Sequence, residues 1–236
     1  MGRDSDWTPA LIVAIALVLA ALFLADGLRE LPARDRFVEV KGFAERDVAA
    51  DLAVWPITYQ VSAPDLAALQ QRIDRADEAV VAFLKLHGFS SDDIRPAPPR
   101  VHDRWMGGAQ DTSRDERYFA ERTLTLRTNN VAAVGQAMGR AAELVGQGVA
   151  LAPNRNADAR FVFTGLEDIK PEMIAVATAD ARRAAAQFAE DSGSRVGAIR
   201  SARQGYFSIT EPDASMPEVK QVRVVTTIEY LLEGER

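Results

Sequence analysis

The two histidines are the side chains best suited to acid–base or metal chemistry near neutral pH, and they stand alone in the sequence. His87 precedes Gly88 at the end of a helical pattern, and His102 follows a proline-rich segment. Neither has a histidine or a carboxylate four residues away, which is the spacing that places two metal ligands on one helix face. We therefore predict that metal-ligating residues are absent and that both histidines lie on the surface.

The serines and the paired acidic residues also lack a catalytic context. Ser62, Ser192 and Ser208 are not flanked by the glycines of a nucleophile elbow. Asp92 and Asp93 are adjacent, and neighbouring carboxylates on a loop are normally solvated. We interpret this acidic pair as a turn or a helix cap and not as a general acid and base.

Two further pairs of residues have ordinary structural explanations. Gly107 and Gly108 are not followed by the Gly-Lys-Ser/Thr of a phosphate-binding loop. Arg182 and Arg183 are adjacent in a helical pattern, where they fit a solvated helix face better than an anion site. We predict no catalytic and no cofactor-binding residues, and hence a protein that is not an enzyme.

The composition excludes further classes of chemistry. The chain contains no Cys, which excludes disulfides, thiolate nucleophiles and cysteine-ligated metal sites. Its net charge is -6, and no segment concentrates Lys and Arg as a phosphate backbone requires. We therefore predict no cofactor and no nucleic-acid partner.

One segment places bulky apolar side chains where a hairpin should turn. Trp105 and Met106 precede two glycines, and Tyr118 and Phe119 follow a charged stretch. Exposed apolar groups on a loop are typical of interaction sites. We predict an interaction or subunit-contact loop at these four residues, and the alternative is a loop that folds back onto its own domain.

The apolar periodicity after residue 36 alternates between strand and helix. The strands are expected at 37–43, 52–62, 94–101, 118–128, 159–164, 196–206 and 220–232, and the helices at 66–86, 131–146 and 171–191. Turn signals are expected at 45–51 and a loop at 208–218. Pro56 lies inside the second strand, so that strand should be bulged or lie at an edge.

The last predicted helix is rich in alanine, which indicates close packing of a helix on a sheet. Ile174, Ala177, Ala181, Ala184, Ala185 and Phe188 fall on one face of this helix. We therefore expect Ile174 and Phe188 to be buried against the sheet. Together these elements predict an α+β fold with helices packed on an antiparallel or mixed sheet.

The first thirty residues resemble a membrane anchor. Pro9–Ala25 contains no charge, and as a helix it would be about 25 Å long, close to the thickness of a bilayer core. We predict a cytoplasmic N-terminus at 1–8, a transmembrane anchor at 9–28, a tether at 29–36 and one domain at 37–234. A cleaved signal peptide is the alternative, but the apolar run is long and Phe23 does not suit a cleavage site.

Two considerations bear on the orientation of this anchor in the membrane. Arg3 alone precedes the span while Arg29, Arg34 and Arg36 follow it, which favours a cytoplasmic domain. Long domains, however, are translocated largely regardless of flanking charge.

Three groups of residues resemble the SIMPL-domain family, a bacterial family that includes periplasmic immunogenic proteins of Gram-negative pathogens. The first runs from Val38 through Gly42 to Asp51, although Ala50 stands where the family usually has Pro. The second runs from Gly148 to Phe163. The third comprises Ala177, Asp180, Ala181, Ala184, Phe188, Gly193 and Val196. Their order and spacing over 37–233 make the set more specific than any one of them.

The resemblance implies an α+β SIMPL-type domain, export to the periplasm, self-association and no established catalytic residues. We therefore expect a noncatalytic, single-pass protein of the bacterial inner membrane with its domain in the periplasm. It would act as an oligomerising scaffold or a stress-related factor of the cell envelope, with the membrane and further copies of itself as partners. A carrier of a small hydrophobic ligand and an envelope enzyme with an unrecognised site remain as alternatives.

Overall fold

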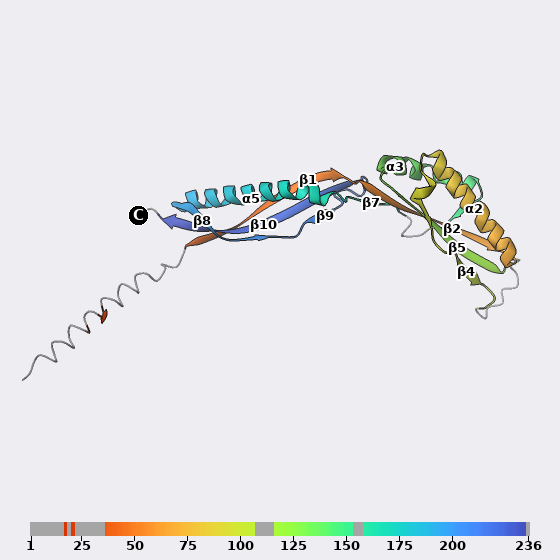
Figure 1. Cartoon of the computed structure of the whole chain (residues 1–236), viewed down its shortest axis with the longest axis horizontal. Coiled ribbons are helices and arrows are strands. Elements are labelled where there is room, and N and C mark those ends of the chain that lie inside the picture. The colour runs from red at the N-terminus through yellow and green to blue at the C-terminus, as the bar shows by residue number, and fades with distance from the viewer. Residues whose placement is uncertain (1–16, 18–19, 22–35, 107–115, 153–157, 235–236) are drawn as a thin grey trace, which may run out of the picture. The chain divides into compact units, whose positions relative to one another are not determined.

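The computed structural model describes residues 17, 20–21, 36–106, 116–152 and 158–234 (Figure 1). From residue 36 onward the described chain divides into two compact units. Unit 1 comprises 36–43, 176–205 and 225–234, and unit 2 comprises 44–106, 116–152, 158–175 and 206–224. Both combine helices with antiparallel strands, so the predicted α+β class is confirmed.

Unit 2 is built on two long central strands, β2 (Leu52–Ala63) and β5 (Tyr118–Thr128). They pair antiparallel without a register shift from Ala53 opposite Thr128 to Ala63 opposite Tyr118. The strands outside them are short pieces. The outer pieces along β5 are β3 (Ile94–Pro96) and β4 (Arg100–Asp103), and those along β2 are β6 (Ala150–Leu151) and β7 (Arg160–Val162).

Pro56 lies where the outer strand along β2 is interrupted. β7 pairs with Leu52–Val54 and β6 with Tyr59–Gln60, so no described strand pairs with Pro56 on that side. β2 lies inside the sheet, and its pairing with β5 has no bulge at Pro56, so the prediction of a bulged or edge strand is wrong for the strand as a whole. Only the segment at Pro56 lacks an outer partner among the described strands. A residue without a backbone N–H is tolerated there because no ladder hydrogen bond is lost.

Helices cover one face of the unit 2 sheet. α2 (Leu66–Leu86) begins after Asp65, whose carboxylate accepts a hydrogen bond from the Ala68 N–H, and Gly88 follows it with φ 87°. The predicted second helix is divided into α3 (Val131–Gly139) and α4 (Ala142–Gly146), and a short 3-10 turn, η1 (Ser91–Asp93), precedes β3. The largest fully buried side chains of this core are Tyr59, Phe83, Leu84, Leu124, Leu126 and Leu144.

Unit 1 contains parts of β1 (Phe37–Ala49), α5 (Leu166–Asp191) and β10 (Val219–Gly234), together with all of β8 (Ser194–Gln204). The strand order is β1-β10-β8. The inward face of β10 is apolar, since Ile228 and Tyr230 are buried and pack with Ala181 and Ala185 of α5. The helix therefore lies on one face of a three-stranded sheet (Figure 1).

Three predicted boundaries are wrong. β1 continues to Ala49 through the predicted turn, and β9 (Ser208–Thr210) lies in the predicted loop, where it pairs with β10. α5 begins at Leu166 and contains Pro171. The Asp51 carboxylate accepts hydrogen bonds from the N–H groups just before Leu166, and a negative charge at this end favours the earlier start.

The predicted burial of Phe188 is also wrong, because its side chain is 50% exposed. The buried stripe of α5 advances by four residues at each step. Its members are Met173, Ala177, Ala181, Ala185 and Ala189. Phe188 is one position away from this stripe, and Ile174 is only partly buried. A stripe of alanines brings the helix backbone close to the sheet and leaves no room for a large ring.

Candidate functional site

The predicted interaction loop is organised around Arg117 at the end of the β4–β5 hairpin. Its guanidinium donates to the Asp103 carboxylate, with Nη2 2.6 Å from Oδ2 and Nε 3.0 Å from Oδ1. The same group lies 4.7 Å from the ring centre of Trp105 and 4.9 Å from that of Tyr118. Arg117 thus holds two of the four predicted residues by cation–π contacts.

Phe119 belongs to a second group on the same hairpin. The Arg104 guanidinium lies 5.4 Å from its ring centre, and the His102 ring centre is 6.1 Å away. Arg104 also donates to the Ser62 hydroxyl and to the Glu116 carbonyl, so the base of the hairpin is tied to the end of β2. The rings therefore sit on a fixed framework of hydrogen bonds.

Met106 is the most exposed of the four residues, at 86%, and Trp105 is 47% exposed. The hydrogen bonds from Arg117 hold the pKa of the Asp103 carboxyl below its usual range, so the ion pair persists at neutral pH. Residues 107–115 lie outside the described residues. The role of the four residues as an interaction loop stays a prediction.

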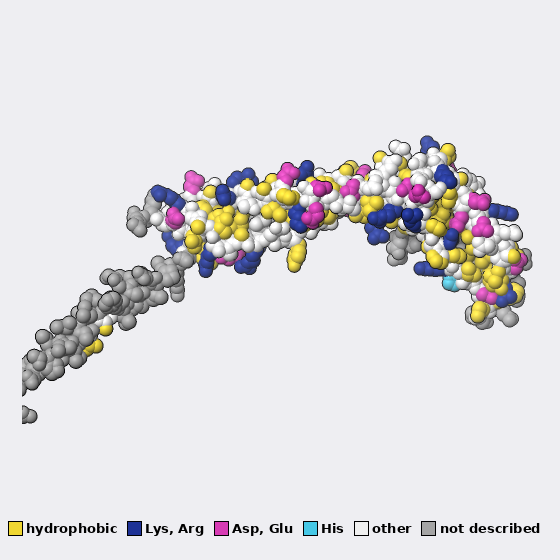
Figure 2. All heavy atoms as spheres, viewed as in Figure 1, with side chains coloured by type: hydrophobic (Ala, Val, Ile, Leu, Met, Phe, Trp, Pro, Cys, Tyr) yellow, Lys and Arg dark blue, Asp and Glu magenta, His cyan; other side chains and the backbone are white. Residues whose placement is uncertain are grey.

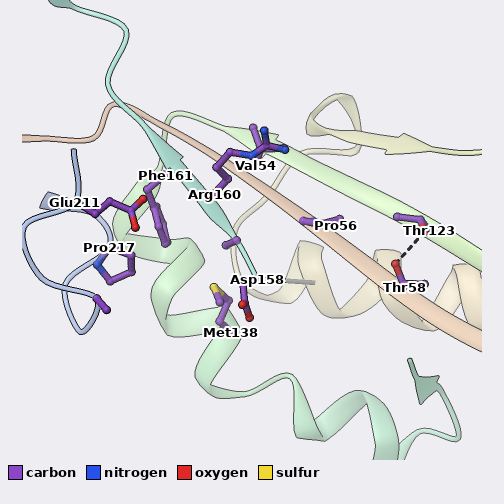
Figure 3. Close-up of a pocket in the computed structure, with 12 residues that line it drawn as sticks. Val54, Pro56, Thr58, Thr123, Met138, Asp158, Arg160, Phe161, Glu211 and Pro217 are labelled. Carbon is purple, nitrogen blue, oxygen red and sulfur yellow. Dashed lines mark hydrogen bonds between the residues drawn. The ribbon is translucent and has the colours of Figure 1, made fainter. Parts of the chain in front are cut away.

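A cleft of about 980 Å³ opens in unit 2 where the outer strand along β2 is broken (Figure 3). Its walls come from β2, β5, β7, α3 and the segment after β9. They are lined by Val54, Pro56, Thr58, Thr123, Met138, Asp158, Ala159, Arg160, Phe161, Glu211, Ala214 and Pro217. The lining is about equally polar and apolar, and it includes three charged side chains. One of them, Glu211, is held by the buried ammonium group of Lys220.

Sequence reasoning missed a partly buried polar network beneath α2. The Tyr59 hydroxyl donates to Asp77 Oδ1 at 2.6 Å, and Arg122 Nη2 donates to Asp77 Oδ2 at 2.8 Å. Burial and the bond to Asp77 raise the pKa of Tyr59, which keeps the hydroxyl protonated. Arg122 lies between Ala120 and Leu124 on the inward face of β5. A charged residue at an inward strand position is the feature of the sequence that could have indicated this network.

The first and third of the motifs that resemble the SIMPL family meet in unit 1. A Cβ placed on Gly42 would overlap the Ala177 oxygen and the Ala181 nitrogen of α5, so only glycine permits this approach. Asp180, between those alanines, accepts a hydrogen bond from the Phe43 N–H at 3.1 Å. The bond from Arg183 and the one from Phe43 lower the pKa of Asp180. The first and third motifs therefore form one contact.

The first and second motifs meet in unit 2 at Asp51, whose N–H donates to the Val162 oxygen at 3.0 Å. Its carboxylate accepts hydrogen bonds from the Thr164 N–H at 2.8 Å, from the Thr164 hydroxyl at 3.0 Å and from the Gly165 N–H at 3.1 Å. Its backbone oxygen accepts one from the Asn129 side chain at 2.7 Å. These bonds connect β2 with the segment that leads into α5.

The remaining sequence candidates are dispersed. His87 caps α2, with Nδ1 2.8 Å from the Phe83 oxygen, whereas His102 is on β4. Asp93 accepts from the Ser90 N–H in a capping box, as the interpretation of the acidic pair required. Within the described ranges, no three His, Asp or Glu side chains gather in a group that could hold a metal ion.

The sequence was also compared with models of known protein families. A family model described as SIMPL, a protein of unknown function (DUF541), matches residues 38–230. Because the match covers most of the chain, the chain belongs to the SIMPL family. A search of curated proteins found no match.

Little of the predicted membrane anchor lies among the described residues. Residues 9–28 lie outside the described residues except for Leu17, Ala20 and Ala21. Across the part of the chain that the structure describes, no helix is long and apolar enough to cross a membrane.

Proposed function

We propose that this SIMPL-family chain is a noncatalytic envelope protein of the bacterial inner membrane. Residues 9–28 anchor it as a single span, and the domain at 37–234 lies in the periplasm. There it acts as a self-associating scaffold in envelope homeostasis or stress tolerance.

The observation that carries the noncatalytic part of the proposal is the use of the motif residues. Gly42 is packed against backbone atoms of α5, and the carboxylates of Asp51 and Asp180 are occupied by backbone N–H groups. A catalytic carboxylate must instead reach a substrate. The residues that mark the family are therefore suited to holding the fold.

Sequence features support the membrane part. Pro9–Ala25 has the length and the apolar character of a span, and Trp7 and Arg29 are residues that favour the two interfaces. The tether then leads directly into β1. The periplasmic placement follows from what the family resemblance implies.

The hairpin end supports self-association. Met106 and Trp105 expose apolar surface on a framework fixed by Asp103 and Arg117, and a pre-ordered surface loses little entropy when it binds. Rigid aromatic groups and arginine are the residues most common at the centres of interfaces. A second copy of the chain is the partner that the resemblance favours.

The test uses the full chain in two steps. Membranes are first washed at alkaline pH, and the protein should remain in the pellet. The mass of the detergent-solubilised protein is then measured and should be a multiple of the chain mass. A Met106→Ser/Trp105→Ala variant should lower this mass, while the control Leu86→Ser, at a residue 80% exposed on α2, should not. Release by the wash would contradict the anchor, and a monomeric parent would contradict self-association.

The cleft beside Pro56 favours one alternative, a carrier of a small hydrophobic ligand. Its volume of about 980 Å³ is within the usual range for ligand sites, and Met138, Phe161 and Pro217 supply apolar walls. Native mass spectrometry of the purified chain decides between the two functions. A bound small molecule that is lost in a Met138→Arg variant would favour the carrier, whereas an unliganded chain favours the scaffold.

A further inference from the structure

The sheet of unit 1 has two unlike faces. One face packs against α5 through Val38, Ile228 and Tyr230. Because side chains alternate along a strand, Phe37 and Phe43 of β1 point to the opposite face, where they are 48% and 51% exposed. They lie six residues apart, so they place exposed aromatic surface at the two ends of the unit 1 part of β1.

Strand β8 adds positive charge to this open face. It contains Arg195, Arg200 and Arg203 and no acidic residue. The same face also carries Lys41 and Glu39 of β1 and Glu229 and Glu233 of β10. Arg195 lies opposite Glu233, and Arg203 lies opposite Thr227. On β10, Glu233 and Thr227 are next to Leu232 and Ile228, whose side chains point to α5. Because side chains alternate along a strand and opposite residues share a face, Arg195 and Arg203 point away from α5.

Arg200 connects the basic strand with the aromatic one. Its guanidinium lies 4.5 Å from the ring centre of Phe37 and 4.0 Å from the Glu229 carboxylate. Arg203 lies 3.7 Å from the same carboxylate, so one negative charge is shared by two positive ones. Basic, acidic and hydrophobic side chains are interspersed on the surface around α5, β8 and β10 (Figure 2).

Protection of a sheet edge is the simpler explanation for the arginines alone. Charged side chains on an edge strand discourage pairing with other chains. That explanation does not account for Phe37 and Phe43, which are on β1, the strand at the other edge of the order β1-β10-β8. A single partner that takes both aromatic rings and cations accounts for all five residues.

The position of this face in the chain identifies the partner. The expected anchor ends at residue 28, and Phe37 follows a tether whose eight residues span at most about 28 Å. The Arg36 oxygen accepts a hydrogen bond from the Leu232 N–H at 2.7 Å, which fixes the start of β1 to β10. The nearest large surface available to the open face is therefore the bilayer that holds the anchor.

We propose that the open face of the unit 1 sheet, defined by Phe37, Phe43, Arg195, Arg200 and Arg203, lies against the anionic surface of that bilayer. The arginines pair with lipid phosphates, for which a guanidinium offers two parallel donors. The aromatic rings occupy the headgroup region, where amphipathic and aromatic side chains are favoured. This inference rests on the membrane anchor of the proposed function.

The absence of Cys makes a direct test available, because one introduced Cys is the only labelling site. Thr227→Cys places a fluorophore on the open face, and Ala186→Cys places one on the exposed side of α5 as a matched control. The full-chain variants are reconstituted in vesicles of phosphatidylcholine and phosphatidylglycerol. A nitroxide on the lipid headgroup should quench the label at 227 several-fold more strongly than the label at 186.

Two further measurements separate the explanations. Adding Arg195→Gln, Arg200→Gln and Arg203→Gln to Thr227→Cys should reduce quenching to the level at 186, with the far-UV circular dichroism unchanged. Equal quenching at both positions in protein that resists an alkaline wash would overturn the docking alone. Loss of the protein in that wash would instead contradict the anchor. Energy transfer between labels at 227 without lipid quenching would assign the face to a second copy and overturn the proposal.

Discussion

Units 1 and 2 hold their helices on their sheets by different means. In unit 2, α2 packs on β2 and β5 through large side chains such as Phe83, Leu84 and Tyr59. In unit 1, α5 meets β1 and β10 through Ala181 and Ala185 and lies against Gly42. Unit 2 is held together by large apolar side chains, whereas in unit 1 small residues let the helix approach the sheet closely.

Their polar groups differ in the same way. The Tyr59 hydroxyl of unit 2 has partners in Asp77 and the Ile73 oxygen. In unit 1 the Tyr230 hydroxyl and the Thr226 Oγ1 are buried without a hydrogen-bond partner among the described residues. The narrow core of unit 1 therefore depends on backbone proximity and contains buried polar atoms without described partners.

The largest effect is expected from removing volume in unit 2. Phe83→Ala should lower the free energy of unfolding by about 3–5 kcal/mol, because the ring is 2% exposed and leaves a cavity. Phe188→Ala, at an exposed ring of unit 1, should change it by about 0.5 kcal/mol. Urea midpoints of the purified chains check both values. A larger loss for Phe188→Ala would mean that the register of α5 is wrong.

Adding volume should be damaging in unit 1. Gly42→Ala should cost about 3 kcal/mol, because the new Cβ meets backbone atoms of α5 that have no rotamer to change. Gly135→Ala in α3 has nothing within 4 Å of its Cβ and should stabilise by about 0.5–1 kcal/mol. Thermal unfolding of the two variants beside the parent is the measurement. If Gly42→Ala unfolds like the parent, the close approach does not exist.

Removing single hydroxyl groups should separate the two cores. Tyr59→Phe should cost about 1–2 kcal/mol, because it removes a hydrogen bond to a charged partner that is itself partly buried. Tyr230→Phe should be neutral or slightly stabilising, since no bond is lost and a buried polar atom is removed. Matched urea titrations decide the point. Equal costs for the two variants would show that Tyr230 has a partner.

The smallest effect is expected from acid. The pKa values of Asp103 in unit 2 and Asp180 in unit 1 are lowered in the folded chain. Their contribution is complete above the unfolded value of about 3.9 and is lost as pH falls through the folded values. Stability should therefore fall below about pH 4. Arg117→Gln and Arg183→Gln should each weaken this dependence in urea titrations, and an unchanged slope would contradict the assignment.

Local patterns were sufficient for much of the fold. The apolar periodicity predicted the limits of α2 at 66–86, and the strand pattern at 220–232 predicted most of β10. The prediction for Phe188 failed because the alanine-rich sequence of α5 is compatible with more than one buried stripe. The close approach to Gly42 selects one of them. That approach is set by tertiary contact and is not encoded in the periodicity of α5.

The candidate site was only partly accessible to the same reasoning. The composition of the hairpin indicated Trp105, Met106, Tyr118 and Phe119 as a group, but not that Arg117 would lie between two of the rings. The cleft beside Pro56 depends on where β6 ends and β7 begins, and two- and three-residue strands have too few residues to show a period. Asp77 and Arg122 are far apart in sequence, so their pairing required the fold.

Placement of the domain outside the cytoplasm underlies the proposed function and is tested most directly by chemical labelling. Met106→Cys supplies a thiol on a residue that is 86% exposed, in a chain with no other Cys. Intact cells are treated with a membrane-impermeant maleimide before and after lysis. We predict full labelling at residue 106 in intact cells. Labelling that appears only after lysis would place the domain in the cytoplasm and contradict the account.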